Sequence, residues 1–215
     1  MKVTAILPAG QFFYVDGPCP FDGSAPRSDA QKWHNWRGSR RSMSNNLQLQ
    51  IVSPESQLQL DAVRNLMRMF IAWHKERHWD QLNLVNAYFD EATFELELAA
   101  LPGRFGAPNG WLCLATYAGE PAGCVGLRKI SEDSCEMKRM FVDPKYQGLG
   151  IGKSLALEII SQARRLGYSR MVLDSGAKQI EAHALYRSLG FVDIAPYYEL
   201  TEALKNWLVF MALDL

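Results

Sequence analysis

Residues 135–174, CEMKRMFVDPKYQGLGIGKSLALEIISQARRLGYSRMVLD, decide the fold. Their first eight residues, 135–142, are largely apolar and strand-like, and a glycine-rich turn follows them. In residues 149–166 the apolar side chains recur three and four positions apart, which is typical of a helix with one buried face. Residues 171–174 then form a second apolar, strand-like run. The order strand, helix, strand predicts a parallel β-α-β unit.

The rest of the chain predicts an α/β domain built on a mixed central sheet. We expect this sheet to be mostly antiparallel, with one parallel and splayed strand pair, and to be flanked by helices. The further strands are expected at residues 47–52, 111–117, 122–130, 191–198 and 207–214. The further helices are expected after Ser53-Pro54-Glu55, where serine and proline are typical of a helix start, over residues 85–101, and in a short segment ending near Gly190.

Composition narrows the class of protein. The 23 basic and 23 acidic residues balance, which argues against a nucleic-acid backbone binder. The apolar runs are far shorter than the roughly 20 residues that cross a bilayer, so no membrane span is expected. The four cysteines form no C-x-x-C pair and indicate free thiols in a reducing cytoplasm.

Residues 1–46 differ from the rest of the chain. They carry 4 of the 10 prolines and no helical or strand periodicity, so we expect an irregular or disordered extension in front of a domain at residues 47–215. An alternative start at Met43 would give a 173-residue protein, with the upstream residues an artefact of the assigned start.

The spacing within residues 135–142 predicts a β-bulge. The apolar side chains fall at Met137, then at Met140 and Val142, so strict alternation breaks between 137 and 140. A bulge splays neighbouring strands and frees backbone N–H groups. The alternative is a central strand with both faces buried, in which alternation means little.

The glycine-rich turn is a candidate anion site. Gly148 and Gly150 lie in the turn, and Gly152 is expected to let the first helical turn pack close to the sheet. Free N–H groups at a helix start favour an anion such as a pyrophosphate, although a plain tight turn explains the glycines equally well. The spacing G-x-G-x-G departs from the dinucleotide fingerprint. The end of a phosphate-binding P-loop is present as Gly152-Lys153-Ser154, but Gln147 stands where its first glycine belongs.

Two segments together resemble the GNAT superfamily of acetyl-CoA-dependent N-acyltransferases. They are Gln147-x-x-Gly150-x-Gly152 after the Val-Asp-Pro turn at 142–144, and the stretch ALYRSLGF at 184–191. The resemblance covers residues 47–215 and implies that main-chain N–H groups of the turn hold the CoA pyrophosphate. It implies that the strand at 140–142 pairs with the pantetheine arm. The cofactor-binding residues it implies are Met140, Phe141, Val142, Gln147, Gly148, Leu149, Gly150, Ile151, Gly152, Lys153, Ser154, Tyr186 and Arg187.

The resemblance also implies catalytic roles. An alkyl ammonium with a pKa near ~10.4 must lose a proton before it attacks, which costs roughly 4 to 5 kcal/mol at pH 7. Glu136 is the first candidate for the general base and Asp174 the second, and Tyr186 is the candidate general acid for the CoA thiolate. An N–H near Met140 or Phe141 would meet the oxyanion. The alternatives are that Glu136 only pairs with Arg128 or Lys138 at a surface and that Tyr186 only packs.

The expected activity is direct acetyl transfer from acetyl-CoA to a primary amine, with no acyl-enzyme, since Cys135 is the nearest thiol and none lies at the turn. The acceptor, a small molecule, a protein N-terminus or a lysine, is left open, as is a homodimer. A non-catalytic acyl-CoA sensor on the same fold is the alternative, and a P-loop-type nucleotide-binding protein is less favoured. No metal is expected: His74 and His78 are read as an exposed polar helix end. The candidate acceptor-pocket aromatics are Trp73, Trp79, Phe105, Trp111, Tyr197 and Tyr198.

Overall fold

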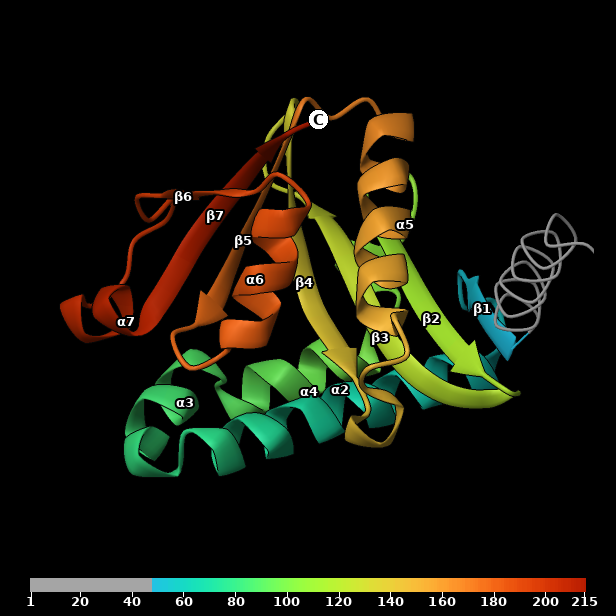
Figure 1. The fold of residues 1–215 in the computed structure, drawn as a ribbon, viewed down its shortest axis with the longest axis horizontal. Coiled ribbons are helices and arrows are strands. Elements are labelled where there is room, and N and C mark those ends of the chain that lie inside the picture. Colours follow the sequence, from blue (N-terminus) through green and yellow to red (C-terminus); the bar gives the residue numbers. More distant parts are fainter. Residues whose placement is uncertain (1–47) are drawn as a thin grey trace, which may run out of the picture. The chain divides into compact units, whose positions relative to one another are not determined.

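Seven strands form one sheet in the order β1-β2-β3-β4-β5-β7-β6 in the computed structural model, which describes residues 48–215 (Figure 1). Within these residues β4 and β5 are the parallel pair and every other pair of neighbours is antiparallel, as predicted. The strands are β1 Leu49–Val52, β2 Trp111–Tyr117, β3 Glu120–Lys129, β4 Ser134–Val142, β5 Arg170–Gly176, β6 Val192–Ile194 and β7 Leu208–Asp214. The extension expected over residues 1–46 lies outside the described residues.

Helices pack on both faces of the sheet and bury two separate cores (Figure 1). Side chains alternate along β2, so Cys113 and Ala115 pack with α5 while Leu112 and Leu114 pack with α2 and α4. The helices are α2 Gln57–Arg77, α3 Leu82–Tyr88, α4 Glu91–Ala99, α5 Ile151–Arg165, α6 Ile180–Ser188 and α7 Glu202–Trp207, with single 3₁₀ turns at η1 Trp79–Gln81, η2 Gly103–Phe105 and η3 Pro144–Tyr146. No helix within residues 48–215 has the length and apolar content to span a bilayer.

Three helix predictions need correction. The first helix begins after Ser56 and not after Ser53, because Ser56 and Gln59 exchange backbone and side-chain hydrogen bonds of 3.1 and 3.2 Å in a capping box. The single helix expected over residues 85–101 is two helices, because Asp90 leaves helical geometry and caps α4 through Thr93. Helix α7 was not predicted, since six residues are too few to show periodicity.

The predicted bulge in β4 is confirmed. Gly126 and Cys124 of β3 pair with Lys138 and Phe141, so two residues of β4, Arg139 and Met140, lie opposite one residue of β3. Arg139 has φ +57°, a left-handed conformation that costs roughly 1–2 kcal/mol for a side-chain-bearing residue. An ion pair of 2.7 Å with Glu97 helps to offset that cost.

Strands β4 and β5 part after Glu136, ahead of the bulge. Their ladder has three rungs and ends at Glu136 and Val172, although β4 continues to Val142 and β5 to Gly176. The facing backbone groups beyond these rungs have no strand partner across the gap. The fold therefore opens a gap inside the sheet itself, between β4 and β5 (Figure 1).

Candidate active site

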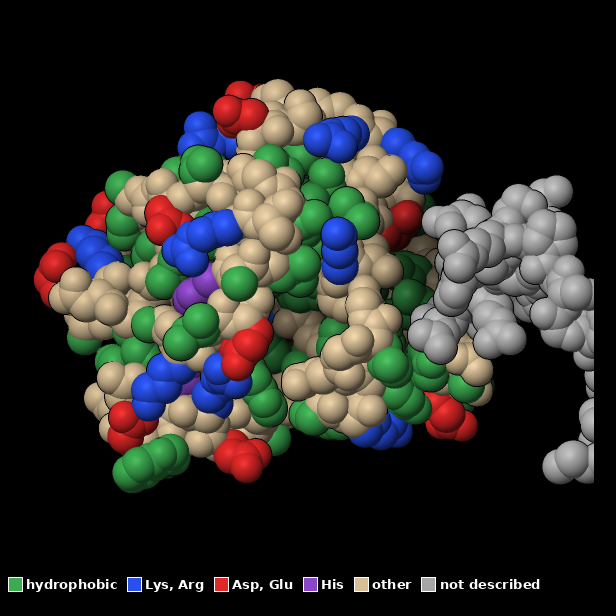
Figure 2. Space-filling model, in the orientation of Figure 1, with side chains coloured by type: hydrophobic (Ala, Val, Ile, Leu, Met, Phe, Trp, Pro, Cys, Tyr) green, Lys and Arg blue, Asp and Glu red, His purple; other side chains and the backbone are tan. Residues whose placement is uncertain are grey.

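A groove of about 470 Å³ lies where the end of β4, the start of α5, helix α6 and helix α2 meet. Figure 2 shows this face hollowed between α6 and the loop before α5. Nine residues expected at the cofactor line it: Met140, Phe141, Val142, Gln147, Gly148, Gly150, Ile151, Gly152 and Tyr186. The remaining lining residues were not expected at the cofactor and come mainly from α2 and α6, although Trp73 was expected in the acceptor pocket. They are Phe70, Trp73, Arg77, Tyr146, Gln179, Glu181, Ala182 and Leu185.

The loop before α5 presents backbone N–H groups to the groove. Gly148 and Gly150 have φ of +78° and +81°, so each adopts a conformation that favours glycine. The first helical hydrogen bond runs from Ser154 N to Gly150 O, which leaves the N–H groups of residues 151–153 without an intrahelical acceptor. Such a helix start attracts anions. Gly152 was expected to pack tightly, but a Cβ there would sit 3.7 Å from its nearest neighbours, an ordinary contact.

Four residues of the expected cofactor set do not line the groove: Leu149, Lys153, Ser154 and Arg187. The Ser154 hydroxyl donates to Gly150 O at 3.2 Å, and the Arg187 guanidinium donates to both Asp193 oxygens at 2.9 and 3.0 Å. Arg187 therefore pairs with strand β6, and its role at the cofactor stays a prediction. The arginine that does line the groove is Arg77 of α2, which pairs with Glu181 at 2.6 Å. The position of Arg77 in the helical pattern of α2 did not indicate that its side chain would line the groove.

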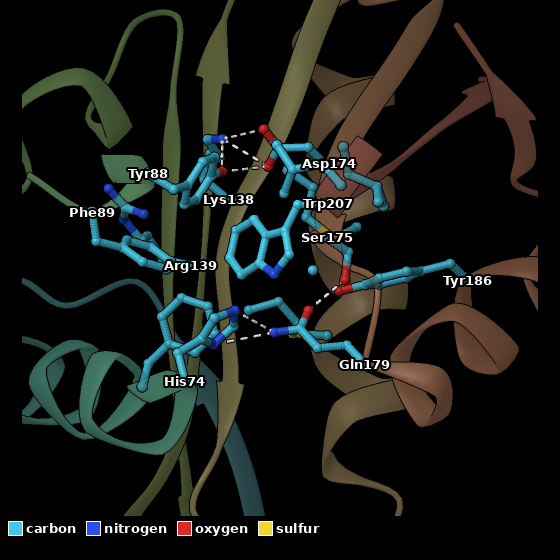
Figure 3. A pocket seen from close by; sticks show the side chains of 16 residues that line it. His74, Tyr88, Phe89, Lys138, Arg139, Asp174, Ser175, Gln179, Tyr186 and Trp207 are labelled. Atoms are coloured by element: carbon cyan, nitrogen blue, oxygen red, sulfur yellow. Dashed lines mark hydrogen bonds and ion pairs between the residues drawn. The ribbon is translucent and has the colours of Figure 1, made fainter. Parts of the chain in front are cut away.

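A small chamber of about 40 Å³ occupies the gap between β4 and β5 (Figure 3). It adjoins the groove, and both are lined by Phe70, Met140, Gln179 and Tyr186. A third hollow of about 270 Å³ lies on the α3 and α4 side, and it shares Tyr88, Phe89, Lys138 and Arg139 with the chamber. The chamber in the gap thus lies between a groove on one face of the sheet and a hollow on the other.

Asp174 lies at the chamber in a buried network (Figure 3). Its oxygens accept hydrogen bonds from Tyr88 Oη at 2.6 Å, from Lys138 Nζ at 2.9 and 3.0 Å, and from Tyr198. Burial disfavours the charged carboxyl, but Lys138 and the two hydroxyls outweigh burial and lower the pKa of Asp174. Burial is also the main cause that raises the pKa of Tyr88 well above its ordinary value. Asp174 is therefore a carboxylate at neutral pH and the tyrosines are protonated.

Glu136 lies deeper than Asp174. Its side chain is 0% exposed and lines none of the three hollows. It accepts hydrogen bonds from Arg128 and from Tyr197 at 2.5 Å, and Lys138 Nζ lies 3.3 Å away. The partners Arg128 and Lys138 were anticipated, but the pairing is buried and not at a surface as that alternative held.

Tyr186 of α6 lines both the groove and the chamber. Its hydroxyl forms no hydrogen bond to another residue within 48–215, and its ring packs against Phe191 at 5.8 Å between centroids. Burial, and to a smaller extent Asp174, raises the pKa of this hydroxyl. Tyr186 therefore remains protonated at neutral pH and has a proton to donate into the groove.

The two helix histidines are buried, which corrects the expectation of an exposed helix end. His74 contacts Gln179 Nε2, and His78 Nδ1 accepts from Trp207 Nε1 at 3.3 Å. Burial, with a smaller contribution from His78, lowers the pKa of His74 to about 3. Residues 48–215 contain no group of three or more side chains suited to a metal ion.

The expected acceptor aromatics divide among several places. Phe105 and Tyr198 line the hollow on the α3 and α4 side, and Trp73 lines the groove. Trp79 is 75% exposed, Trp111 packs in the α5 core, and Tyr197 binds Glu136. Cys135 is fully buried, and burial raises the pKa of its thiol to about 12. It is therefore unsuited to act as a nucleophile.

Comparison with known proteins finds similarity to N-acetyltransferases in both sequence and fold. The model of the acetyltransferase (GNAT) family matches residues 64–191. A protein named as an uncharacterized N-acetyltransferase of Schizosaccharomyces pombe is 38% identical over 124 residues, 54% of this chain and 76% of that protein. The N-acetylaspartate synthetase of Homo sapiens is 33% identical over 119 residues, 54% of this chain and 38% of that protein. The solved PaiA N-acetyltransferase from Thermoplasma acidophilum in complex with coenzyme A shares the fold, with a TM-score of 0.58 at 16% identity over 78% of this chain and 99% of that chain.

Proposed function

This chain belongs to the GNAT acetyltransferase family and is an acyltransferase, and from that premise we propose direct transfer of an acetyl group from acetyl-CoA to a primary amine. One observation carries the proposal: the chamber in the gap between β4 and β5 lies between the groove and the hollow on the opposite face and shares lining residues with both. An amine and a thioester bound from opposite faces would meet there, with no covalent enzyme intermediate. The buried thiol of Cys135 agrees with that route.

The groove suits coenzyme A in two respects. The free N–H groups at the start of α5 suit a pyrophosphate, and the apolar walls from β4 and α6 suit the pantetheine arm. When bound, acetyl-CoA supplies the acyl group as an activated thioester. We assign the pyrophosphate to the loop from Gln147 to Gly152 and the oxyanion to a main-chain N–H near Met140 or Phe141. That a CoA complex of PaiA shares this fold supports the assignment.

Asp174 fits the role of general base better than Glu136, because Asp174 lines the chamber and Glu136 does not. The cations Lys138 and Arg139 disfavour an ammonium in the chamber, so the amine reacts in its neutral form. The amine nitrogen attacks the thioester carbonyl carbon and forms the C–N bond, and the C–S bond breaks as the tetrahedral intermediate collapses. The surplus proton on nitrogen passes to Asp174 through the hydroxyl of Tyr88 or Tyr198 and from there to solvent. Tyr186 donates its proton to the leaving sulfur and regains one from solvent.

Turnover and CoA affinity, measured on the same variants, test this function. We expect Tyr186→Phe and Asp174→Asn to lower kcat roughly 10²- to 10⁴-fold while CoA affinity by calorimetry stays near wild type. Tyr168→Phe is the matched control, since this buried tyrosine bonds Asn109 O, away from all three hollows. Unchanged turnover in both site variants would remove the catalytic assignments. CoA binding without transfer to any amine would favour the acyl-CoA sensor, and Mg-ATP binding lost in Lys153→Ala would favour the P-loop alternative.

The acceptor panel for this assay holds small amines, amino acids and peptide N-termini. L-aspartate is included, because a relative is named for the synthesis of N-acetylaspartate. We assign the activity to residues 47–215, so a chain that begins at residue 47 is expected to keep the full rate. The proposed compartment is the reducing cytoplasm, supported by the three buried free thiols.

A further inference from the structure

The hollow on the α3 and α4 side has more hydrogen-bond donors than free acceptors. Four cations line it: Arg104, Arg128, Lys138 and Arg139. Its carboxylates already have partners, since Asp90 caps α4 through Thr93 and Glu97 accepts from Arg139. The hollow therefore offers donors that lack acceptors, and its acceptors are already occupied.

The two inner cations differ in the hydrogen-bond donors that they have left. Lys138 Nζ donates to Asp174 and to Tyr88, and it lies 3.3 Å from Glu136. Arg139 donates to Glu97 at 2.7 Å and stacks over the ring of Phe94, 5.2 Å from its centroid. Lys138 has little remaining capacity for a ligand, whereas the terminal nitrogens of Arg139 form no hydrogen bond within residues 48–215. Both side chains line the end of the hollow that adjoins the chamber.

The two outer arginines also have N–H groups without a hydrogen-bond acceptor within residues 48–215. Arg104 is 47% exposed, and its one ion pair among residues 48–215 is a 3.7 Å contact with Glu97, whose other oxygen binds Arg139. Arg128 uses Nε for Glu136, and within residues 48–215 its two terminal nitrogens form no hydrogen bond. Both arginines also line a neighbouring shallow hollow of about 400 Å³. They therefore stand together where the hollow meets its surroundings, with N–H groups available.

We propose that the acceptor amine carries a carboxylate, which the outer N–H groups of Arg104 and Arg128 bind while the amino group reaches the chamber. This inference rests on the proposed function and deepens it by naming the class of acceptor. A guanidinium presents a planar fork that matches a carboxylate, and it stays charged at every working pH. A diamine or polyamine would bring a second cation to these arginines and is disfavoured by charge repulsion.

Matched acceptor pairs that differ in one charge test the inference. The full chain is assayed for kcat/KM with β-alanine against 3-aminopropanamide and with 4-aminobutanoate against 4-aminobutanamide. We expect wild type to prefer each carboxylate over its amide roughly 10- to 100-fold, mainly through KM, as for one or two charge-assisted hydrogen bonds. Arg104→Gln and Arg128→Lys are each expected to reduce that ratio about tenfold. Lysine at 128 keeps a charge for the buried Glu136.

The control variant is Arg68→Gln, since Arg68 is a half-exposed arginine of α2 that pairs with Glu95 and lines none of these hollows. Its ratio is expected to equal that of wild type. Equal rates for carboxylate and amide in wild type, or an unchanged ratio in both Arg104→Gln and Arg128→Lys, overturn the inference. A preference for phosphoethanolamine over β-alanine overturns the carboxylate in favour of a phosphate.

The preference for a carboxylate can be tested even if the protein transfers no acetyl group. If CoA binds but no amine is acetylated, the same ratios are measured as dissociation constants of the unreacted pairs by calorimetry on the CoA-loaded protein. Tighter binding of the carboxylate members, lost in Arg104→Gln, upholds the site without transfer. Equal affinity for both members rejects it.

Discussion

Replacing Asp174 with asparagine should destabilise the protein by about 3 kcal/mol. The side chains of Asp174 and Lys138 are 3% and 13% exposed, so the substitution leaves a buried ammonium without its main counter-ion. Breaking a buried pair costs roughly 3–5 kcal/mol, and Glu136 at 3.3 Å still partly compensates Lys138, which places the expected loss at the lower end. Urea unfolding at pH 7, followed by circular dichroism, measures it.

The pairing itself is tested with Lys138→Met. The double variant Lys138→Met/Asp174→Asn should recover at least half of the loss, because no buried charge is left unpaired between these two positions. The pKa of Asp174 is lower in the folded protein than its usual value of 3.8, so its stabilisation is present above about pH 4 and is lost as the pH falls below it. The difference in the free energy of unfolding between wild type and Asp174→Asn should therefore decrease below pH 4. Two results would refute this reasoning. One is a loss of unfolding free energy under about 1 kcal/mol for Asp174→Asn at pH 7. The other is a double variant whose loss exceeds the sum of the losses of the two single variants.

Three other predictions concern stability and reactivity. The pKa of His74 is about 3 in the folded protein and about 6.5 in the unfolded one, so the unfolded state takes up the proton first as the pH falls. Between pH 7 and 5 the free energy of unfolding of wild type, measured in urea, should therefore fall by about 2 kcal/mol more than that of His74→Gln. Equal losses would contradict the burial argument. Ser56→Ala should cost about 1 kcal/mol through the lost helix cap, whereas Ser53→Ala should stay within about 0.5 kcal/mol, both by thermal melting; the reverse order would restore the start at Ser53. Iodoacetamide should label the buried thiols in urea but not in the native protein, as read by mass spectrometry, and native labelling of any of them would show an opening that the fold does not contain. These thiols are Cys113, Cys124 and Cys135.

Structural features that are set by residues adjacent in the sequence could be predicted from the sequence. The bulge follows from the spacing of Met137, Met140 and Val142, because alternation in a strand is a property of adjacent residues. The glycine-rich turn and the start of α5 follow from the left-handed conformations that Gly148 and Gly150 adopt. The break at Asp90 was missed for a related reason. The apolar spacing is helical on both sides of it, and periodicity does not reveal which acidic residue turns to cap a helix.

Sequence alone determined the order of the elements, the mixed sheet with one parallel pair, and the loop that faces the groove. Tertiary structure decided the site: Tyr88 lies 86 positions and Lys138 36 positions from Asp174 along the chain, yet both contact its carboxylate. It also decided that His74 and His78 are buried and that Arg187 turns to Asp193. The physical reason is one of range. Backbone geometry responds to residues a few positions away, whereas burial, charge pairing and pKa depend on side chains that only the folded sheet brings together.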